Sequence, residues 1–238
     1  MKITIDDNIL TNFPETKIGW LTVDITEVVK ESEYVDRIKR QLETRMNDIG
    51  ISTDTMMLHP DLLKWREVFS KMKVKPSKYR SSLEALLRRI FKGELWSVST
   101  IVDLYDTVSA MNLLPMGAFD LDKIDGDLIL RYGKSDEKFL PLGSDEEIIE
   151  VKPEHIVYAD DKRICCWLWN HRDSREVALT STTKRALFMI DSAFETEWRT
   201  VEEGLETLSL ELSKIGAKEL NRGISDKKTP STDTEAKK

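Results

Sequence analysis

The fold is decided by the stretch between residues 127 and 170, which contains Leu128-Ile129-Leu130-Arg131, Ile156-Val157-Tyr158-Ala159 and the run from Arg163 to Trp169. These segments are rich in β-branched and aromatic residues, as is typical of strands. Helical patterns stand in blocks before and after them and do not alternate with single strands. This order predicts an α+β domain with a mixed or antiparallel sheet packed by helices, and argues against a doubly wound sheet.

Working outward from this block, apolar periodicity and capping residues predict the remaining elements. Upstream, residues 2–28 read as two strands around a turn at 12–14. Four helices are then expected, at 31–48, at 60–72 after Pro60, at 83–90 with Ser81 or Ser82 as N-cap, and at about 97–111. Downstream, a strand is expected at 186–190 and a long amphipathic helix at 193–217. The tryptophans expected in the core are Trp65, Trp96, Trp167 and Trp198.

The last residues differ in composition from the rest of the chain. After Gly223 the sequence is mostly Lys, Ser, Thr, Asp and Glu, which cannot bury much apolar surface. We therefore predict one domain over residues 1–222 and a disordered tail over residues 223–238.

Composition excludes several classes of function. The only cysteines, Cys165 and Cys166, are adjacent, and adjacent cysteines rarely bridge. The three histidines are too widely spaced for a zinc pattern, so no metal and no cofactor is expected. No apolar run is long enough to span a membrane, and the N-terminus turns acidic too soon for a secretory signal. These features together favour the cytoplasm.

A basic segment runs from Lys64 to Lys92. It carries ten basic against two acidic residues, in a chain whose net charge is −7. A local basic stripe on an acidic protein suits a polyanion docked at one place. The alternative is a solvated helix face followed by a basic linker.

No nucleophile elbow, P-loop or dinucleotide fingerprint is present. Three stretches instead resemble the editing domain of the bacterial phenylalanyl-tRNA synthetase beta subunit. These are Ile101-Val102-Asp103-Leu104-Tyr105-Asp106 with Leu114 to Ile124, then Gly126 to Arg131, then Ile156 to Asp161 with Ile164 to Arg172. With Pro76 to Ser82 upstream, the run is similar to the free-standing B3/B4 domain proteins. The resemblance covers roughly residues 60–195, and Ala118 to Gly126 is its most specific part.

The chain departs from the synthetase pattern at three places. Gly117 stands where the synthetase domain has a histidine, and Asp106 stands where it has an asparagine. The glycine-rich loop after the last strand is replaced by Trp169-Asn170-His171-Arg172-Asp173. A pocket of different shape and charge is therefore expected, and selectivity for tyrosine does not carry over.

The resemblance implies a trans-acting deacylase that hydrolyses the ester of mischarged tRNA. Such a site holds the ester and places a water near its carbonyl, so neither a side-chain nucleophile nor a cofactor is needed. The implied partner is the aminoacylated end of tRNA, and possibly a synthetase. The alternatives are a non-catalytic module that binds tRNA, a free amino acid or a partner protein, and a hydrolase of a small acylated metabolite.

The resemblance also implies roles for particular residues. Catalytic roles are expected for Arg80, Asn170 and His171. Substrate binding is expected from Tyr79, Ser81, Asp103, Asp106, Gly117, Asp120 and Arg172, and tRNA binding from Lys73, Lys75, Lys78, Arg88 and Arg89. Alternatives stay open for several of them: Asp120 as a cap, Asp103 exposed to solvent, the loop of Tyr79 and Arg80 packed on its own helix, and His171 inert.

Overall fold

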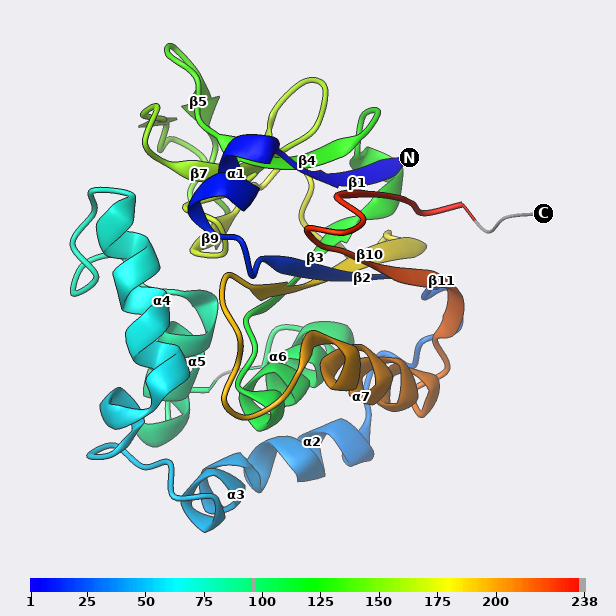
Figure 1. The fold of residues 1–238 in the computed structure, drawn as a ribbon. Coiled ribbons are helices and arrows are strands. Elements are labelled where there is room, and N and C mark those ends of the chain that lie inside the picture. The colour runs from blue at the N-terminus through cyan, green and yellow to red at the C-terminus, as the bar shows by residue number, and fades with distance from the viewer. Residues whose placement is uncertain (96, 236–238) are drawn as a thin grey trace.

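The computed structural model describes residues 1–95 and 97–235, and it is an α+β fold with two sheets and a layer of helices (Figure 1). The first sheet has the strand order β12-β1-β4-β7-β8-β9. Its strands are β1 (Lys2–Ile5), β4 (Leu128–Tyr132), β7 (Ile156–Ala159), β8 (Ile164–Trp167), β9 (Arg172–Asp173) and β12 (Ser231–Asp233). This sheet is mixed, because β1 and β4 are parallel while the other neighbours are antiparallel.

The second sheet is antiparallel, with the order β11-β2-β10-β3. Its strands are β2 (Lys17–Asp24), β3 (Met116–Asp120), β10 (Arg185–Ser192) and β11 (Lys218–Ser225). Both faces of β10 are buried: Leu187 and Met189 join the core between the sheets, and Phe188 and Ile190 join the core under the helices. The alternation follows from the two-residue period of a strand.

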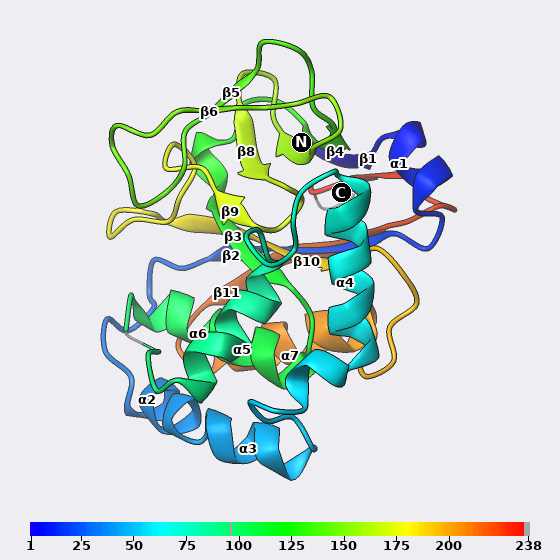
Figure 2. The same ribbon diagram turned by 90° about the vertical axis from the view of Figure 1, so that its left-hand side faces the viewer.

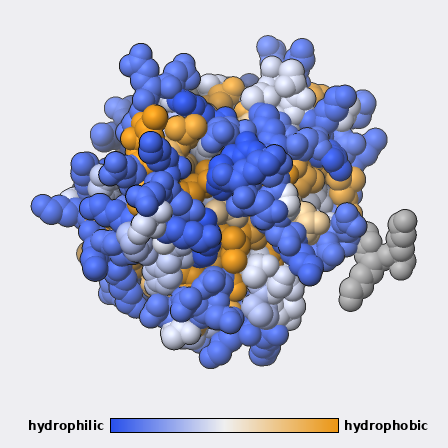
Figure 3. All heavy atoms as spheres, turned by 90° about the horizontal axis from the view of Figure 1, so that it is seen from above, coloured by the Kyte–Doolittle hydropathy of each residue, from blue (hydrophilic) through white to orange (hydrophobic). Residues whose placement is uncertain are grey.

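Helices cover the outer face of the second sheet, and Figure 2 shows α4 rising beside both sheets. The helices are α1 (Asp7–Asn12), α2 (Glu33–Arg40), α3 (Leu42–Asp48), α4 (Pro60–Lys71), α5 (Ser82–Phe91), α6 (Thr100–Asn112) and α7 (Val201–Ser213). Short 3-10 turns lie at Met56–Leu58 and Leu121–Lys123, and β5 (Lys138–Phe139) pairs with β6 (Ile149–Glu150). The face in Figure 3 is mostly hydrophilic, with apolar residues showing between the polar side chains.

Most predicted elements are confirmed, and the differences have local causes. The predicted helix over 31–48 is two helices that meet at Gln41, and the predicted helix over 193–217 begins only at Val201, after the capping box of Thr200. Trp198 precedes that helix and is 42% exposed, so its predicted burial is wrong. Trp65 and Trp167 are buried as expected, and Trp96 lies outside the described residues. The first two strands exist but pair in different sheets, because α1 separates them.

The predicted disordered tail is wrong for residues 223–235. Residues 218–225 form β11, and Ser231–Asp233 form β12 against β1. Gly223 lies so close to Trp20 that a Cβ there would be 2.5 Å from the indole, and the Trp20 Nε1–H donates to Thr232 at 2.7 Å. Strand pairing with β2 and β1 therefore orders this segment, although its own side chains bury little apolar surface. Residues 236–238 of the predicted tail lie outside the described residues.

Among the described residues, no helix combines the length and the apolar character needed to cross a membrane.

Candidate functional site

Two loops that are far apart in the sequence meet at one end of the sheets. The loop before α5 is tied to the segment after β8, because the Ser82 N–H donates to the Asn170 carbonyl at 3.0 Å. The imidazole of His171 contacts the Arg80 carbonyl at 2.7 Å, and its ring lies 5.5 Å from that of Tyr79. These contacts bring the loop before α5 and the segment after β8 together at one place.

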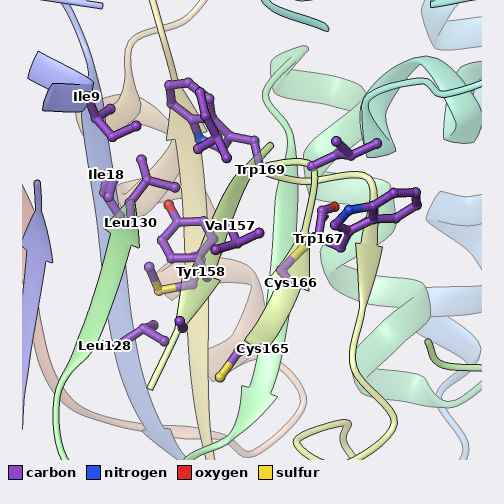
Figure 4. Close-up of a cluster of buried hydrophobic side chains, with 14 of the residues drawn as sticks. Ile9, Ile18, Leu128, Leu130, Val157, Tyr158, Cys165, Cys166, Trp167 and Trp169 are labelled. Atoms are coloured by element: carbon purple, nitrogen blue, oxygen red, sulfur yellow. Dashed lines mark hydrogen bonds between the residues drawn. The ribbon is translucent and has the colours of Figure 1, made fainter. Parts of the chain in front are cut away.

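The segment after β8 turns through an uncommon backbone conformation. Leu168 and Trp169 have φ angles of 53° and 63°, a left-handed region that costs a side-chain-bearing residue on the order of 1 kcal/mol or more. Both side chains are fully buried, and the Trp169 indole makes edge-to-face contacts with Phe13 and Trp65 at centroid distances of 5.3 and 5.5 Å. Figure 4 shows the Trp169 and Trp167 indoles in different parts of this buried cluster. Burial of the Leu168 and Trp169 side chains therefore stabilises the turn, which places Asn170 and His171 at the pockets.

A cavity of about 630 Å³, which we name the outer pocket, opens beside this turn. Its wall combines cationic and aromatic side chains with a smaller acidic part. Its lining residues are Lys73, Val74, Lys75, Lys78, Tyr79, Glu147, Ile149, Glu150, Lys152, His155, Trp167, His171 and Arg172. The three lysines predicted to bind tRNA therefore lie together with Tyr79.

His155 in the outer pocket has a fixed tautomer. The Trp167 Nε1–H donates to His155 Nδ1 at 3.0 Å, and the Lys152 backbone N–H points at the same nitrogen at 3.2 Å. An indole N–H only donates, so Nδ1 accepts and the ring proton of neutral His155 is on Nε2. Burial lowers the pKa of His155, which keeps the ring neutral near pH 7.

A second cavity of about 60 Å³, which we name the inner pocket, adjoins the outer pocket, and His171 and Arg172 line both. It lies between the two sheets, beside the first residue of α5. Its lining residues are Ser82, Met116, Gly117, Phe119, Tyr158, Cys166, Trp169, Asn170, His171, Arg172, Asp173, Met189 and Asp191.

The inner pocket holds two carboxyl groups. Burial raises the pKa of Asp191 to about 7 and that of Asp173 to about 6. Asp191 accepts hydrogen bonds from the Tyr158 hydroxyl and from Asn170 Nδ2, the latter at 3.5 Å. Because the amide nitrogen faces Asp191, the buried Asn170 Oδ1 is left without a partner among the described residues. The pocket therefore presents acceptors to whatever enters it.

His171 lies where the two pockets join. A carbonyl oxygen only accepts, so the contact with Arg80 places the proton of neutral His171 on Nδ1 and leaves the lone pair on Nε2. Burial is the largest cause that lowers its pKa, and the neighbouring Arg172 and Arg80 lower it further. His171 is thus a neutral imidazole with one basic nitrogen, which is the form that a general base requires.

Three residues predicted to act in catalysis, substrate binding or tRNA binding have side chains that contact Glu84 and lie outside both pockets. Glu84 is 2% exposed and pairs with Arg66 at 2.7 Å, Arg88 at 2.9 Å and Arg80 at 3.4 Å. The Arg80 guanidinium therefore does not line the site, although its backbone carbonyl orients His171. Ser81 caps α5 by accepting from the Glu84 N–H at 3.2 Å. Three cations of the basic segment are thus engaged by one buried carboxylate.

The aspartates predicted to hold the substrate are engaged elsewhere. Asp103 is neither solvent-exposed nor in a pocket, because it pairs with Lys39 at 2.9 Å and accepts from Ser97 and Val98. Asp120 caps the 3-10 turn that follows β3, which was the alternative for this residue, and also accepts from Thr183 at 2.7 Å.

Asp106 lies on the same helix as Asp103, outside the residues that line the pockets. Burial raises its pKa to about 6, and the positive charge of Arg89 opposes this rise.

Asp173, Asp191 and His155 line the pockets, and the sequence analysis assigned them no role. Asp191 belongs to the strand β10, where it appears as a charged residue after an apolar run, Ala186-Leu187-Phe188-Met189-Ile190. A charge at the end of a buried strand is the signal that could have found it. Pairing of β10 with β3 is what places Asp191 near Gly117.

These features define an α+β domain with a basic outer pocket leading into a small acidic one. The B3/4 domain model matches residues 64–211, and the chain belongs to that family. Two relatives are phenylalanine–tRNA ligase beta subunits. That of Chromobacterium violaceum is 40% identical over 76 residues, covering 32% of this chain and 9% of the subunit. That of Francisella tularensis is 31% identical over 78 residues, covering 33% of this chain and 10% of the subunit. The matched part is thus about a tenth of these curated relatives.

Among solved structures, an N-terminal fragment of the phenylalanyl-tRNA synthetase beta subunit from Pyrococcus horikoshii is similar over 91% of this chain and 49% of that chain. The TM-score is 0.47 and the sequence identity is 13%.

Proposed function

We propose that this chain is a trans-acting aminoacyl-tRNA deacylase that hydrolyses the ester of a mischarged tRNA. The observation that carries the proposal is the sharing of His171 and Arg172 by the outer and inner pockets. A substrate with a nucleotide in one pocket and an acyl group in the other would have its ester at these two residues. Membership of the B3/4 domain family, with phenylalanine–tRNA ligase beta subunits among its relatives, supports a tRNA substrate.

The outer pocket suits the 3′ end of tRNA. Lys73, Lys75 and Lys78 would meet phosphate oxygens, and the Tyr79 ring offers a face for a base to stack on. His155 Nε2–H supplies one further donor of fixed orientation. Lys78 lies over the Tyr79 ring at 5.1 Å, so the cation and the aromatic surface are presented together.

At the ester, His171 Nε2 would accept a proton from the attacking water and return it to the ribose oxygen as the bond between that oxygen and the carbonyl carbon breaks. The water needs to lie within ~3 Å of both Nε2 and the ester carbonyl. Arg172, whose guanidinium pairs with Glu147 at 3.0 Å, would also attract the negative charge that develops on the carbonyl oxygen, and the free hydroxyl of the terminal ribose would help to orient the water. In this arrangement His171 supplies, from the segment after β8, the imidazole that Gly117 on β3 lacks.

The cysteines do not suit covalent catalysis. Cys165 and Cys166 are buried, and burial raises the pKa of both thiols well above the usual range. A protonated, enclosed thiol is a poor nucleophile. Water is therefore the proposed attacking group.

A second candidate function is a non-catalytic module that binds the end of tRNA with the same pockets. Gly117 favours it, because a Cβ there would meet only the Asp173 carboxylate, at 3.8 Å, and the position brings no polar side chain of its own.

The test is a deacylation assay on a panel of tRNAs mischarged with different amino acids, with release of the amino acid as the readout. First-order loss of at least one ester, dependent on enzyme concentration, would support the deacylase. Binding of tRNA without turnover of any ester would favour the binding module.

A further inference from the structure

The inner pocket is small, and its walls are rigid. Its volume of about 60 Å³ is room for on the order of four water-sized groups. Phe119, Tyr158 and Trp169 form part of its wall, and each is at most 2% exposed. Such side chains are held by close packing on their other sides, so the pocket cannot expand without repacking the core.

The charge of the inner pocket also limits which ligands it can bind. Asp173, Asp191 and Asn170 Oδ1 are acceptors, and Asn170 is 8% exposed with that oxygen unpartnered among the described residues. Arg172 is the cation that lines the inner pocket among the described residues, and its guanidinium pairs with Glu147 at 3.0 Å and donates to the Leu142 carbonyl at 3.1 Å. Tyr158 and Asn170 donate to Asp191, and the Cys166 thiol is hydrogen-bonded to Asp173, but these donors are neutral. Buried negative charge is stabilised further by an opposite charge, which a cationic ligand would supply.

Gly117 leaves a small space beside the Asp173 carboxyl group. A methyl group at this position would touch nothing closer than Asp173 Oδ2 at 3.8 Å, so the missing side chain leaves space next to the carboxylate. This is the space into which a short side chain of the ligand, or its ammonium group, would fit.

From these observations we infer that the inner pocket takes the α-ammonium group and short side chain of a glycyl, alanyl or seryl ester and excludes phenylalanyl and tyrosyl esters. This inference rests on the proposed function, because it assigns the class of acyl group to the same site. The ammonium group lies against Asp173 and Asp191 and donates to Asn170 Oδ1. An aromatic side chain, whose ring alone would fill the pocket, is rejected by size.

The first experiment compares one tRNA carrying alanine, serine, phenylalanine or tyrosine. We expect kcat/KM to be at least 100-fold higher for alanyl- and seryl-tRNA than for the aromatic esters. N-acetylalanyl-tRNA, which keeps the small side chain and loses the positive charge, is expected to react at least 10-fold more slowly than alanyl-tRNA. Equal turnover of alanyl and tyrosyl esters would overturn the inference and leave the proposed deacylase standing.

A second experiment separates the inference from catalysis. Non-hydrolysable 3′-amide analogues of alanyl- and tyrosyl-adenosine are titrated into the protein, with the heat of binding as the readout. The alanyl amide is expected to bind at least 10-fold more tightly, and the G117A variant, which narrows the pocket, is expected to weaken its binding several-fold. If no ester is hydrolysed but this preference holds, the deacylase proposal fails and the inference stands. Equal affinity for the two amides, or tighter binding of the tyrosyl amide, would refute the inference.

Discussion

The imidazole Nδ1 of His171 lies 2.7 Å from the backbone carbonyl oxygen of Arg80. This contact joins the segment after β8 to the loop before α5, and it fixes the tautomer of the one histidine that lines both pockets. The Arg80 residue therefore contributes its backbone to the site, while its guanidinium pairs with Glu84.

The first prediction concerns His171. The H171N variant can still donate to the Arg80 carbonyl, but it has no basic nitrogen, so deacylation should fall by about 10²- to 10⁴-fold with little change in melting temperature. The matched control is H59N, because His59 caps α4 and lies outside both pockets. Single-turnover rates on a hydrolysed ester would measure both variants. Wild-type rates in H171N would show that His171 is not the base.

The second prediction concerns the lysines of the outer pocket. The double variant K75A/K78A should bind tRNA more weakly, and the slope of log affinity against log salt should become shallower by roughly 0.7 to 0.9 for each phosphate that is no longer neutralised. K227A, which removes an exposed lysine outside the pocket, should keep the wild-type slope. An unchanged slope in the double variant would mean that the outer pocket does not hold phosphate.

The third prediction concerns the thiols. Because Cys165 and Cys166 are buried and their pKa values are raised, iodoacetamide should modify neither in the folded protein at pH 8. Turnover should survive the treatment, and mass spectrometry of quenched reactions should show no acylated protein. Modification of either cysteine after unfolding in urea is the positive control. An acyl adduct on any residue would contradict attack by water.

The fourth prediction concerns pH and stability. The pKa of Asp191 is raised to about 7 from a usual value of 3.8, so the folded state holds this proton more tightly than the unfolded state. The folded state therefore loses stability relative to the unfolded state as pH rises from about 4 to about 7. In the D191N variant, the Asn oxygen can still accept from Tyr158. The fall in stability between pH 4 and pH 7 is absent, because an amide does not titrate. The melting temperature of D191N should exceed that of wild type at pH 8 by several degrees, with the difference shrinking toward pH 4.

The control for this measurement is D54N, an exposed carboxylate, which should follow the wild-type melting curve at each pH. A difference between D191N and wild type that did not vary between pH 4 and pH 8 would show that Asp191 titrates normally.

The fifth prediction concerns the C-terminal strand. Trp20 is 1% exposed and donates to the Thr232 hydroxyl at 2.7 Å. The T232V variant keeps the shape but leaves the indole N–H unpaired, which should lower the free energy of unfolding by about 1 to 3 kcal/mol. T229V, at an exposed position in the turn before β12, is the control. Urea denaturation curves measure both, and equal stability of T232V and wild type would contradict the role of β12.

The sequence by itself was enough for the fold class and for the existence of most elements. The period of the apolar residues, the N-cap Ser81, and the strand runs of β4, β7 and β10 are local signals, and each depends on near neighbours. The resemblance to B3/B4 proteins also rested on contiguous motifs, and the family match confirms it. For the same reason the loop from Asn170 to Arg172 could be singled out before its surroundings were known.

Only the tertiary structure decided how these pieces meet. It assigned Asp103 and Asp120 to Lys39 and Thr183, and it brought Asp173 and Asp191 into the pocket beside Gly117. It also ordered β12 against β1 at the opposite end of the chain. Pairing between distant strands and the burial of a charge depend on contacts across many residues, which residue type and local spacing do not encode. A carboxylate that caps a turn and one that lines a pocket look alike in sequence and differ only in what surrounds them.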